Sequence, residues 1–333
     1  MDGTALPTFL SGDSAGIRQA AELLQAGQCV ATPTETVYGL AGDAFNEAAV
    51  RSIFAIKNRP YIDPLIVHFH ELSQLEQLTQ LSAAQQTVVQ QLSDAFWPGP
   101  LTMILPKQPE VSGLVTANRE SVAVRQPAHP VMRELLKVSG LYLAAPSANP
   151  FGYISPTTAQ HVRDSLKERC PHILDGGACI SGVESTIIDI RKPDAPCLLR
   201  PGPIGAEELA SVLDRPITKP TPQSDASLAP GMLERHYSPR TGLSLYNQGE
   251  LPELAPGEAR IFLKRPSPGI SSQSRDYWFS ETGALDEIAH CLFGLLRALD
   301  TDSEIERIHC EIPQPGPGVA DAIRDRLTRA SKR

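Results

Sequence analysis

Several common catalytic motifs are missing from this chain of 333 residues. It has no G-x-x-x-x-G-K-[ST] phosphate loop, no H-E-x-x-H zinc motif and no G-x-S-x-G nucleophile elbow. Its nearest approach to a G-x-G-x-x-G dinucleotide motif, Gly316-Pro-Gly318, lacks the third glycine. These absences weigh against P-loop nucleotidases, zinc proteases, α/β-hydrolases and Rossmann dehydrogenases.

Cysteine pairs and long apolar runs are missing as well. None of the six cysteines forms a C-x-x-C pair, so we expect reduced, buried thiols and no metal site. No apolar run approaches the roughly 18 residues that span a bilayer, and the first residues lack the pattern of a signal peptide. We therefore expect a cytoplasmic protein without a membrane segment. The net charge of −8 argues against a large non-specific nucleic-acid surface, although a local basic groove stays open.

Strand-like and helix-like segments alternate through the first two thirds of the chain. Apolar, β-branched runs such as 101–105 and 121–125 predict strands. Amphipathic periodicity predicts helices, with Ser14 and Asn46 as two of the N-caps. Because some strands follow each other too closely for a helical crossover, the sheet should be mixed. We expect an α/β fold with a twisted, mixed open sheet and flanking helices.

The composition changes near residue 215. The following stretch to residue 239 holds five prolines and few large apolar residues, which is typical of a semi-extended linker. Strand and helix patterns then resume. The expected organisation is a catalytic domain at 1–214, a proline-rich linker at 215–240 and a small α/β domain at 241–333.

Polar residues are densest in P-T-E-T-V-Y-G, K-N-R-P and P-L-I-V-H, between residues 33 and 68. Lys57 and Arg59 lie two apart at the end of a predicted helix, where both can point into one pocket and compensate a triphosphate. Thr34 and Thr36 place two hydroxyls on one side of an extended segment. The alternative interpretation is a turn followed by a solvated basic pair.

Three later motifs allow both a functional and a structural interpretation. Arg125 ends an apolar strand, where it either clamps a carboxylate or forms an ion pair at a sheet edge. Ser147 and Asn149 follow a strand end, where open α/β sheets bind ligands, but they could also simply form a turn. Ser155 alone is better explained as a helix cap. Tyr237, inside the linker, either closes over the pocket or anchors the linker.

Taken in order, the motifs resemble the Sua5/YrdC/YciO family of threonylcarbamoyl-AMP synthases over about residues 14–215. The resemblance rests on P-T-E-T-V-Y-G-L, K-N-R-P, D-P-L-I-V-H, F-W-P-G-P-L-T, V-A-V-R, A-P-S-A-N, S-P-T, G-V-E-S-T-I-I-D and L-R-P-G. H-Y-S-P and the last helical segments resemble the longer Sua5 form, which adds a C-terminal domain.

The resemblance implies a nucleotidyltransferase that makes threonylcarbamoyl-AMP and pyrophosphate from L-threonine, bicarbonate or CO₂, and ATP. The product would serve the modification of adenosine 37 in tRNA, through downstream tRNA threonylcarbamoyl transferase proteins. Mg²⁺ would be carried by the ATP phosphates, because it keeps waters and needs few protein ligands.

The resemblance also implies the site residues. Lys57 and Arg59 would be catalytic. The L-threonine side would be formed by Thr36, His68, Arg125, Ala145 and Ser185. The ATP side would be formed by Arg59, Asp63, Ser121, Ser147, Asn149, Ser155, Arg200 and Tyr237. Asp63 stands where the family usually has asparagine, which adds a negative charge near the nucleotide.

Other functions remain to be weighed. One is a divergent paralogue that binds nucleotide without turnover, which Asp63 would favour. Another is an RNA-binding module, or weak RNA binding beside the synthase activity, on a concave face of the fold. A third is a related carbamoyl-adenylate-forming enzyme, but such proteins usually carry further domains whose motifs are absent from this sequence.

Overall fold

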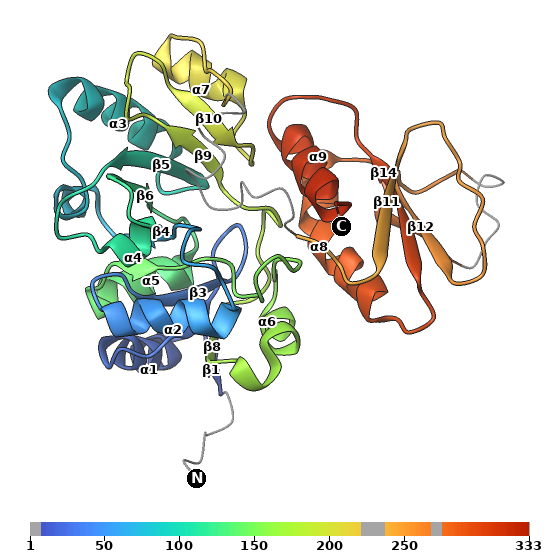
Figure 1. Cartoon of the computed structure of the whole chain (residues 1–333), viewed down its shortest axis with the longest axis horizontal. Helices are drawn as coiled ribbons and strands as arrows, with labels where there is room; N and C mark the ends of the chain where they lie inside the picture. Colours follow the sequence, from blue (N-terminus) through green and yellow to red (C-terminus); the bar gives the residue numbers. More distant parts are fainter. Residues whose placement is uncertain (1–7, 221–236, 268–274, 333) are drawn as a thin grey trace.

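The structure is a computed structural model that describes residues 8–220, 237–267 and 275–332. Its larger sheet has ten strands in the order β1-β8-β2-β3-β7-β4-β6-β5-β9-β10 (Figure 1). The strands are β1 (Phe9–Ser11), β2 (Val30–Thr32), β3 (Gly39–Asp43), β4 (Ile66–His68), β5 (Leu101–Pro106), β6 (Ser121–Arg125), β7 (Leu143–Ala144), β8 (His172–Asp175), β9 (Thr186–Asp189) and β10 (Cys197–Arg200). The sheet contains both parallel pairs, such as β4 with β6, and antiparallel pairs, such as β5 with β6. The expected mixed open sheet is confirmed.

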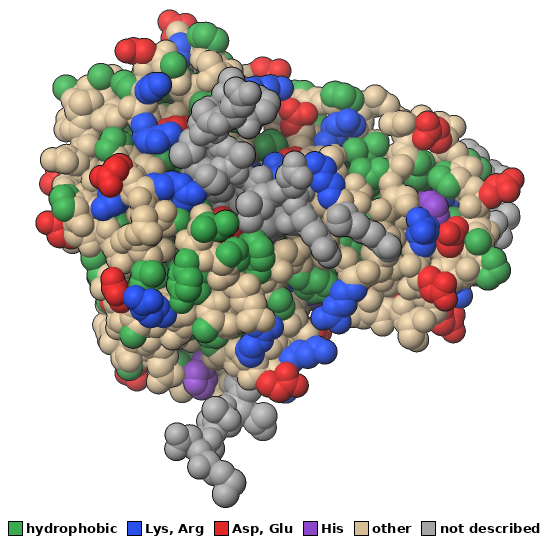
Figure 2. All heavy atoms as spheres, in the orientation of Figure 1, with side chains coloured by type: hydrophobic (Ala, Val, Ile, Leu, Met, Phe, Trp, Pro, Cys, Tyr) green, Lys and Arg blue, Asp and Glu red, His purple; other side chains and the backbone are tan. Residues whose placement is uncertain are grey.

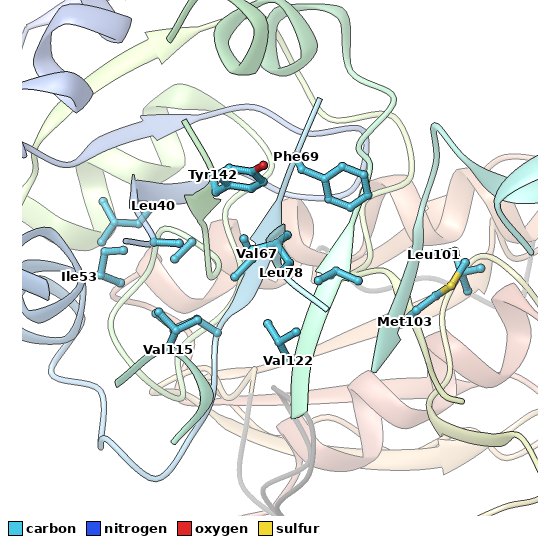
Figure 3. Packing of buried hydrophobic residues seen from close by; sticks show 14 of the residues in the cluster. Leu40, Ile53, Val67, Phe69, Leu78, Leu101, Met103, Val115, Val122 and Tyr142 are labelled. Atoms are coloured by element: carbon cyan, nitrogen blue, oxygen red, sulfur yellow. The ribbon is translucent and has the colours of Figure 1, made fainter. Parts of the chain in front are cut away.

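Helices cover both faces of this sheet, and together they form the first domain. On one face lie α1 (Ser14–Gln25) and α5 (Pro130–Ser139), whose apolar sides share a core cluster with the sheet. The other face carries α2 (Glu47–Lys57), α3 (Ala83–Phe96), α6 (Ala159–Leu166) and α7 (Ala206–Leu213). Shorter turns of helix are η1 (Leu72–Gln77), α4 (Gly113–Thr116) and η2 (Lys167–Arg169). Figure 3 shows the second cluster, in which Leu40, Ile53 and Val67 are buried together. Each such side chain contributes about 1.5–3 kcal/mol by leaving water.

A second domain follows, built on a parallel four-stranded sheet in the order β11-β14-β12-β13. Its elements are β11 (Gly242–Asn247), β12 (Glu258–Lys264), β13 (Asp276–Ser280), α8 (Leu285–Thr301), β14 (Arg307–Ile312) and α9 (Val319–Ala330). Figure 1 shows α8 and α9 between the two sheets. The expected small α/β domain is confirmed as a fold. The domain limits at 214 and 240 stay a prediction, since most of the expected linker lies outside the described residues.

Two helix caps differ from the prediction. Asp13 rather than Ser14 caps α1. Its carboxylate accepts hydrogen bonds from the backbone N–H groups of Ala15 at 2.9 Å and Gly16 at 3.0 Å. Thr158 rather than Ser155 caps α6. The predicted cap at Asn46 is confirmed, with its side chain accepting from two backbone N–H groups.

Some elements were not predicted at all, namely β1, β3, β8, β13, α4 and α7. The segment of β3 reads G-L-A-G-D, and glycine and alanine have low strand propensity. It is nevertheless a strand because β2 and β7 pair with it on its two sides. Within the described ranges, no helix is both long and apolar enough to cross a membrane.

Candidate active site

A cavity lies beside the ends of β4 and β6 in the first domain. These strands are parallel neighbours with His68 opposite Arg125, and each of the two residues is the last of its strand. A bridge between Gly39 and Ser147 brings the loops that precede β3 and follow β7 to the same place. The cavity is lined by Thr34, Thr36, Val37, Gly39, Arg59, Ile66, His68, Arg125, Ala145, Pro146, Ser147, Glu184, Ser185, Arg200 and Tyr237.

The structure brings most of the predicted site residues together. Those that line the cavity are Thr36, Arg59, His68, Arg125, Ala145, Ser147, Ser185, Arg200 and Tyr237. Those that lie outside its lining are Lys57, Asp63, Ser121, Asn149 and Ser155, all of them buried. Residues separated by up to 201 positions (Thr36 to Tyr237) thus meet in one place, which favours a common site over separate local roles.

Arg125 is held by the first domain and faces the cavity. Its Nε–H donates to the Gly99 carbonyl at 3.2 Å, one terminal nitrogen donates to the Thr36 hydroxyl at 3.0 Å, and the other pairs with Glu35 at 2.5 Å. Glu35 also accepts from the Ala128 N–H at 3.1 Å. Burial raises the pKa of Glu35, but Arg125 outweighs this effect and leaves that pKa below its ordinary value. Since β6 lies between β4 and β5, the alternative of an arginine at a sheet edge is wrong.

The two threonines of the P-T-E-T segment form a hydrogen-bonded turn. The Thr34 hydroxyl oxygen lies 3.2 Å from both the Thr36 and Val37 backbone nitrogens, whose N–H groups donate to it. It also lies 2.8 Å from the Thr36 hydroxyl. Thr36 is therefore fixed from two directions, by Thr34 and by Arg125.

Arg59 reaches the cavity from the residues after α2. The helix ends at Lys57 because Asn58 takes a left-handed conformation with φ 51°. Arg59 donates to the carbonyls of Asp63 at 3.2 Å and Pro64 at 2.7 Å, and its guanidinium lies 2.8 Å from the Asp63 carboxylate. Asp63 therefore partly neutralises Arg59, the cation that is predicted to face ATP.

Lys57 lies behind the cavity wall. Its ammonium group donates to the backbone carbonyls of Ser147 and Asn149, the latter at 2.6 Å. Complete burial and the nearby Arg59 lower the pKa of Lys57 well below its ordinary value. The Asn149 side chain stays within the same loop, donating to the Pro150 and Tyr153 carbonyls. Lys57 thus holds the S-A-N loop in this structure, whereas the sequence placed both cations in one pocket.

Ser185 and Arg200 form the opposite wall. Arg200 donates from Nε to the Ser185 carbonyl and from a terminal nitrogen to the Ser185 hydroxyl, both at 3.0 Å. The Ser185 hydroxyl lies 2.8 Å from that of Thr102. These contacts join β5 and β10 to Ser185, the residue before β9.

His68 remains neutral at physiological pH. Burial and the adjacent Arg125 lower its pKa to about 3. Its Nδ1 has no hydrogen-bond partner among the described residues. A neutral, buried imidazole facing a cavity can donate or accept a hydrogen bond but adds no charge.

Ser121, Ser155 and Tyr237 complete the predicted set. Ser121 opens β6 at the end opposite Arg125, so a strand's length separates it from that side chain. The Ser155 hydroxyl donates to Glu184 at 2.5 Å. Tyr237 is buried and its ring stacks on Phe293 of α8, with centroids 5.8 Å apart.

The sequence interpretation missed Glu35 and Glu184. Both stand inside motifs that were singled out, and both are carboxylates between apolar or small residues, which would need a cationic partner once buried. Glu35 pairs with Arg125, and Glu184 lines the cavity and pairs with Arg326 of α9 at 2.7 Å. A search for partners of buried carboxylates would have found this signal.

Electrostatically, the cavity is suited to anions. Arg59, Arg125 and Arg200 converge on it, together with hydroxyl groups that can donate hydrogen bonds. In the part of the chain that is described, no group of three or more His, Cys, Asp or Glu side chains could hold a metal ion. On the face shown in Figure 2, basic and acidic side chains are interspersed, unlike the continuous basic surface of a dedicated nucleic-acid binder.

The chain is similar to known proteins over almost its whole length. A family model for Sua5, YciO and YrdC, described as telomere recombination, matches residues 22–202, and one described as the threonylcarbamoyl-AMP synthase C-terminal domain matches residues 204–332. The threonylcarbamoyl-AMP synthase of Bacillus subtilis is 39% identical over 97% of this chain and 94% of its own length. That of Pyrococcus abyssi is 37% identical, over 95% and 94%. The crystal structure of P. abyssi Sua5 complexed with L-threonine has a TM-score of 0.86 at 33% identity, covering 98% of each chain.

Proposed function

The chain belongs to the Sua5 family of threonylcarbamoyl-AMP synthases, and from this premise we propose that it makes threonylcarbamoyl-AMP and pyrophosphate from L-threonine, bicarbonate or CO₂, and ATP. The observation that carries the proposal is the convergence of Arg59, Arg125 and Arg200 on one small cavity. The product would serve tRNA modification through separate transferase proteins.

We place the L-threonine carboxylate on Arg125. A guanidinium group has five N–H donors, and the described residues use three of them, so two remain for a substrate carboxylate. Thr36 and Ser185 offer hydroxyls, while Ala145 leaves room for the substrate side chain. His68, being neutral, suits the uncharged amine that must react with CO₂.

We place ATP towards Arg59, Ser147, Arg200 and Tyr237. A carboxylate oxygen of N-carboxythreonine attacks the α-phosphorus of ATP. The bond between this phosphorus and the oxygen that bridges to the β-phosphate breaks, and pyrophosphate leaves with the electron pair. Because this step joins two anions, catalysis depends mainly on positioning and on charge neutralisation by fixed cations. The protein needs to supply no nucleophile.

Mg²⁺ would enter with the ATP phosphates. Glu184 lines the cavity, and Glu35 and Asp63 contact arginines that line it. Each of the three carboxylates is paired with an arginine. A phosphate-borne ion, keeping most of its waters, fits this donor set better than a site of protein carboxylates. A cytoplasmic location, the transferase partners and weak RNA binding stay predictions.

Pyrophosphate release from ATP, Mg²⁺ and bicarbonate, measured with and without L-threonine, tests the proposal. We expect threonine-dependent release from the wild type, and its loss in Arg59→Ala. The matched control is Arg51→Ala, which removes an exposed arginine from α2, the helix that ends two residues before Arg59. If a folded wild-type protein releases no pyrophosphate in response to L-threonine, the proposal is wrong.

A further inference from the structure

One wall of the cavity is held by the second domain. We propose that Arg326 of α9 is a positioning residue for the ATP side of the cavity, and that it acts through Glu184. The kinetic part of this inference rests on the proposed function, whereas the binding part does not.

Glu184 links the cavity to α9. Arg326 Nε lies 2.7 Å from one oxygen of Glu184, and the Ser155 hydroxyl donates to the other at 2.5 Å. The Arg326 side chain has 0% of its surface exposed. Glu184 lines the cavity, so the charge and position of this carboxylate act directly on a ligand that binds there.

The same guanidinium also supports Tyr237. It lies over the tyrosine ring at 5.1 Å from the centroid, on a residue whose backbone takes a left-handed φ of 62°. Such cation–π contacts stabilise most strongly when both groups are desolvated, as they are here. Arg326 therefore contacts Tyr237 directly and is linked to Ser155 by way of Glu184. Both Tyr237 and Ser155 are predicted ATP-side residues.

Backbone packing fixes the wall against α8 as well. Gly182 has φ +70°, and a Cβ atom there would lie 2.2 Å from the Ala289 carbonyl oxygen. The carbonyl of Ile180 lies 3.0 Å from Nδ1 of His290. Val183 belongs to the core cluster of the second domain. The residues leading to Glu184 are thus packed closely against α8.

Charge explains why Arg326 should matter for ATP in particular. Without Arg326, Glu184 would be a buried carboxylate facing a cavity that must accept a polyphosphate, and like charges in low dielectric repel strongly. The guanidinium that is proposed to bind the L-threonine carboxylate depends on other contacts, because Arg125 is held by Glu35, Thr36 and Gly99 of the first domain. Loss of Arg326 should therefore weaken ATP binding more than L-threonine binding.

The experiment compares Arg326→Met with the double variant Glu184→Gln/Arg326→Met. Methionine removes the charge and keeps much of the volume, and glutamine removes the carboxylate left unpaired. The control is Arg260→Met, which breaks the buried ion pair with Asp276 in the same domain. Since Ala259 and Ile261 face α8 and α9, Arg260 lies on the opposite face of the sheet. Full-length variants are assayed for ATP affinity by calorimetry and for both KM values by pyrophosphate release.

We expect Arg326→Met to raise the Kd and KM for ATP at least about tenfold, as for an uncompensated buried charge. The KM for L-threonine should change by less than about threefold, and the double variant should recover most of the ATP affinity. Arg260→Met should leave ATP affinity unchanged.

Three results would overturn the inference. They are unchanged ATP affinity in folded Arg326→Met, equal losses for ATP and L-threonine, and a double variant no better than the single one. If Arg326→Met does not fold, Arg326→Lys takes its place, and a loss of ATP affinity as large as that expected for methionine counts against a role of charge. If the wild type shows no threonine-dependent pyrophosphate release, the proposed function fails, while the calorimetric series still decides whether Arg326 controls ATP binding.

Discussion

Replacing Lys57 with methionine separates two roles that this residue can have. In the structure its ammonium group donates to the carbonyls of Ser147 and Asn149 and lies outside the cavity lining. Removing the lysine leaves the Asn149 carbonyl without this donor, which costs about 1–3 kcal/mol, whereas the part-buried Ser147 carbonyl still accepts from the Asn149 N–H at 3.0 Å. Methionine fills similar volume and removes the desolvation cost of a buried amine, so we expect a net loss of about 2 kcal/mol in the free energy of unfolding.

Urea unfolding of wild type and Lys57→Met measures this loss. The control Lys137→Met removes an exposed lysine of α5 and should stay within about 0.5 kcal/mol of the wild type. The KM for ATP should rise in Lys57→Met because the loop that carries Ser147 loosens. A variant that is as stable as the wild type yet releases no pyrophosphate would refute this reasoning, and would show that Lys57 acts on the substrate as the sequence predicted.

Three further substitutions test the cavity. Asp63→Asn removes the negative charge 2.8 Å from Arg59, so calorimetry should show ATP binding about fivefold tighter. The ATP-free protein should lose about 3 kcal/mol in the free energy of unfolding, because Arg59 is left without its ion pair. Unchanged ATP affinity would contradict this prediction. His68 has a pKa of about 3 when folded and about 6.5 when unfolded, so stability falls as pH drops through that window. Between pH 6.5 and 5, the free energy of unfolding should therefore fall by about 1.6 kcal/mol less in His68→Gln than in the wild type, as measured by urea unfolding; equal losses would argue against a buried neutral imidazole. Arg125→Lys keeps the charge but loses the planar guanidinium that can bind a carboxylate through two hydrogen bonds. The KM for L-threonine should therefore rise about tenfold, with little change in the KM for ATP. A rise in the KM for ATP alone would place Arg125 on the ATP side of the cavity.

Local sequence signals predicted elements well where the element is stabilised locally. The Asn46 cap and the apolar strand of residues 121–125 were both found, because a cap and a β-branched run are short-range patterns. The strand at residues 39–43 was not found, since its pairing partners are distant and its own residues have low strand propensity.

The candidate site shows the same limit. The motifs indicated which residues meet in the cavity, but not which cations face it. Arg59 and Lys57 look equivalent in sequence, yet one lines the cavity and the other binds two carbonyls behind it. The pair of Glu184 with Arg326 spans 142 positions and two domains, so no local pattern could join them.

One buried cluster contains residues of both domains, and this affects how the protein is made. Val37, Ile154 and Val183 of the first domain belong to the same buried cluster as the helices α8 and α9. During synthesis these side chains leave the ribosome on the order of 10 s before the last helix does. Until then an apolar patch beside the nascent cavity has nothing to cover it, which makes the half-finished chain a natural client for chaperones and the first domain alone prone to aggregate.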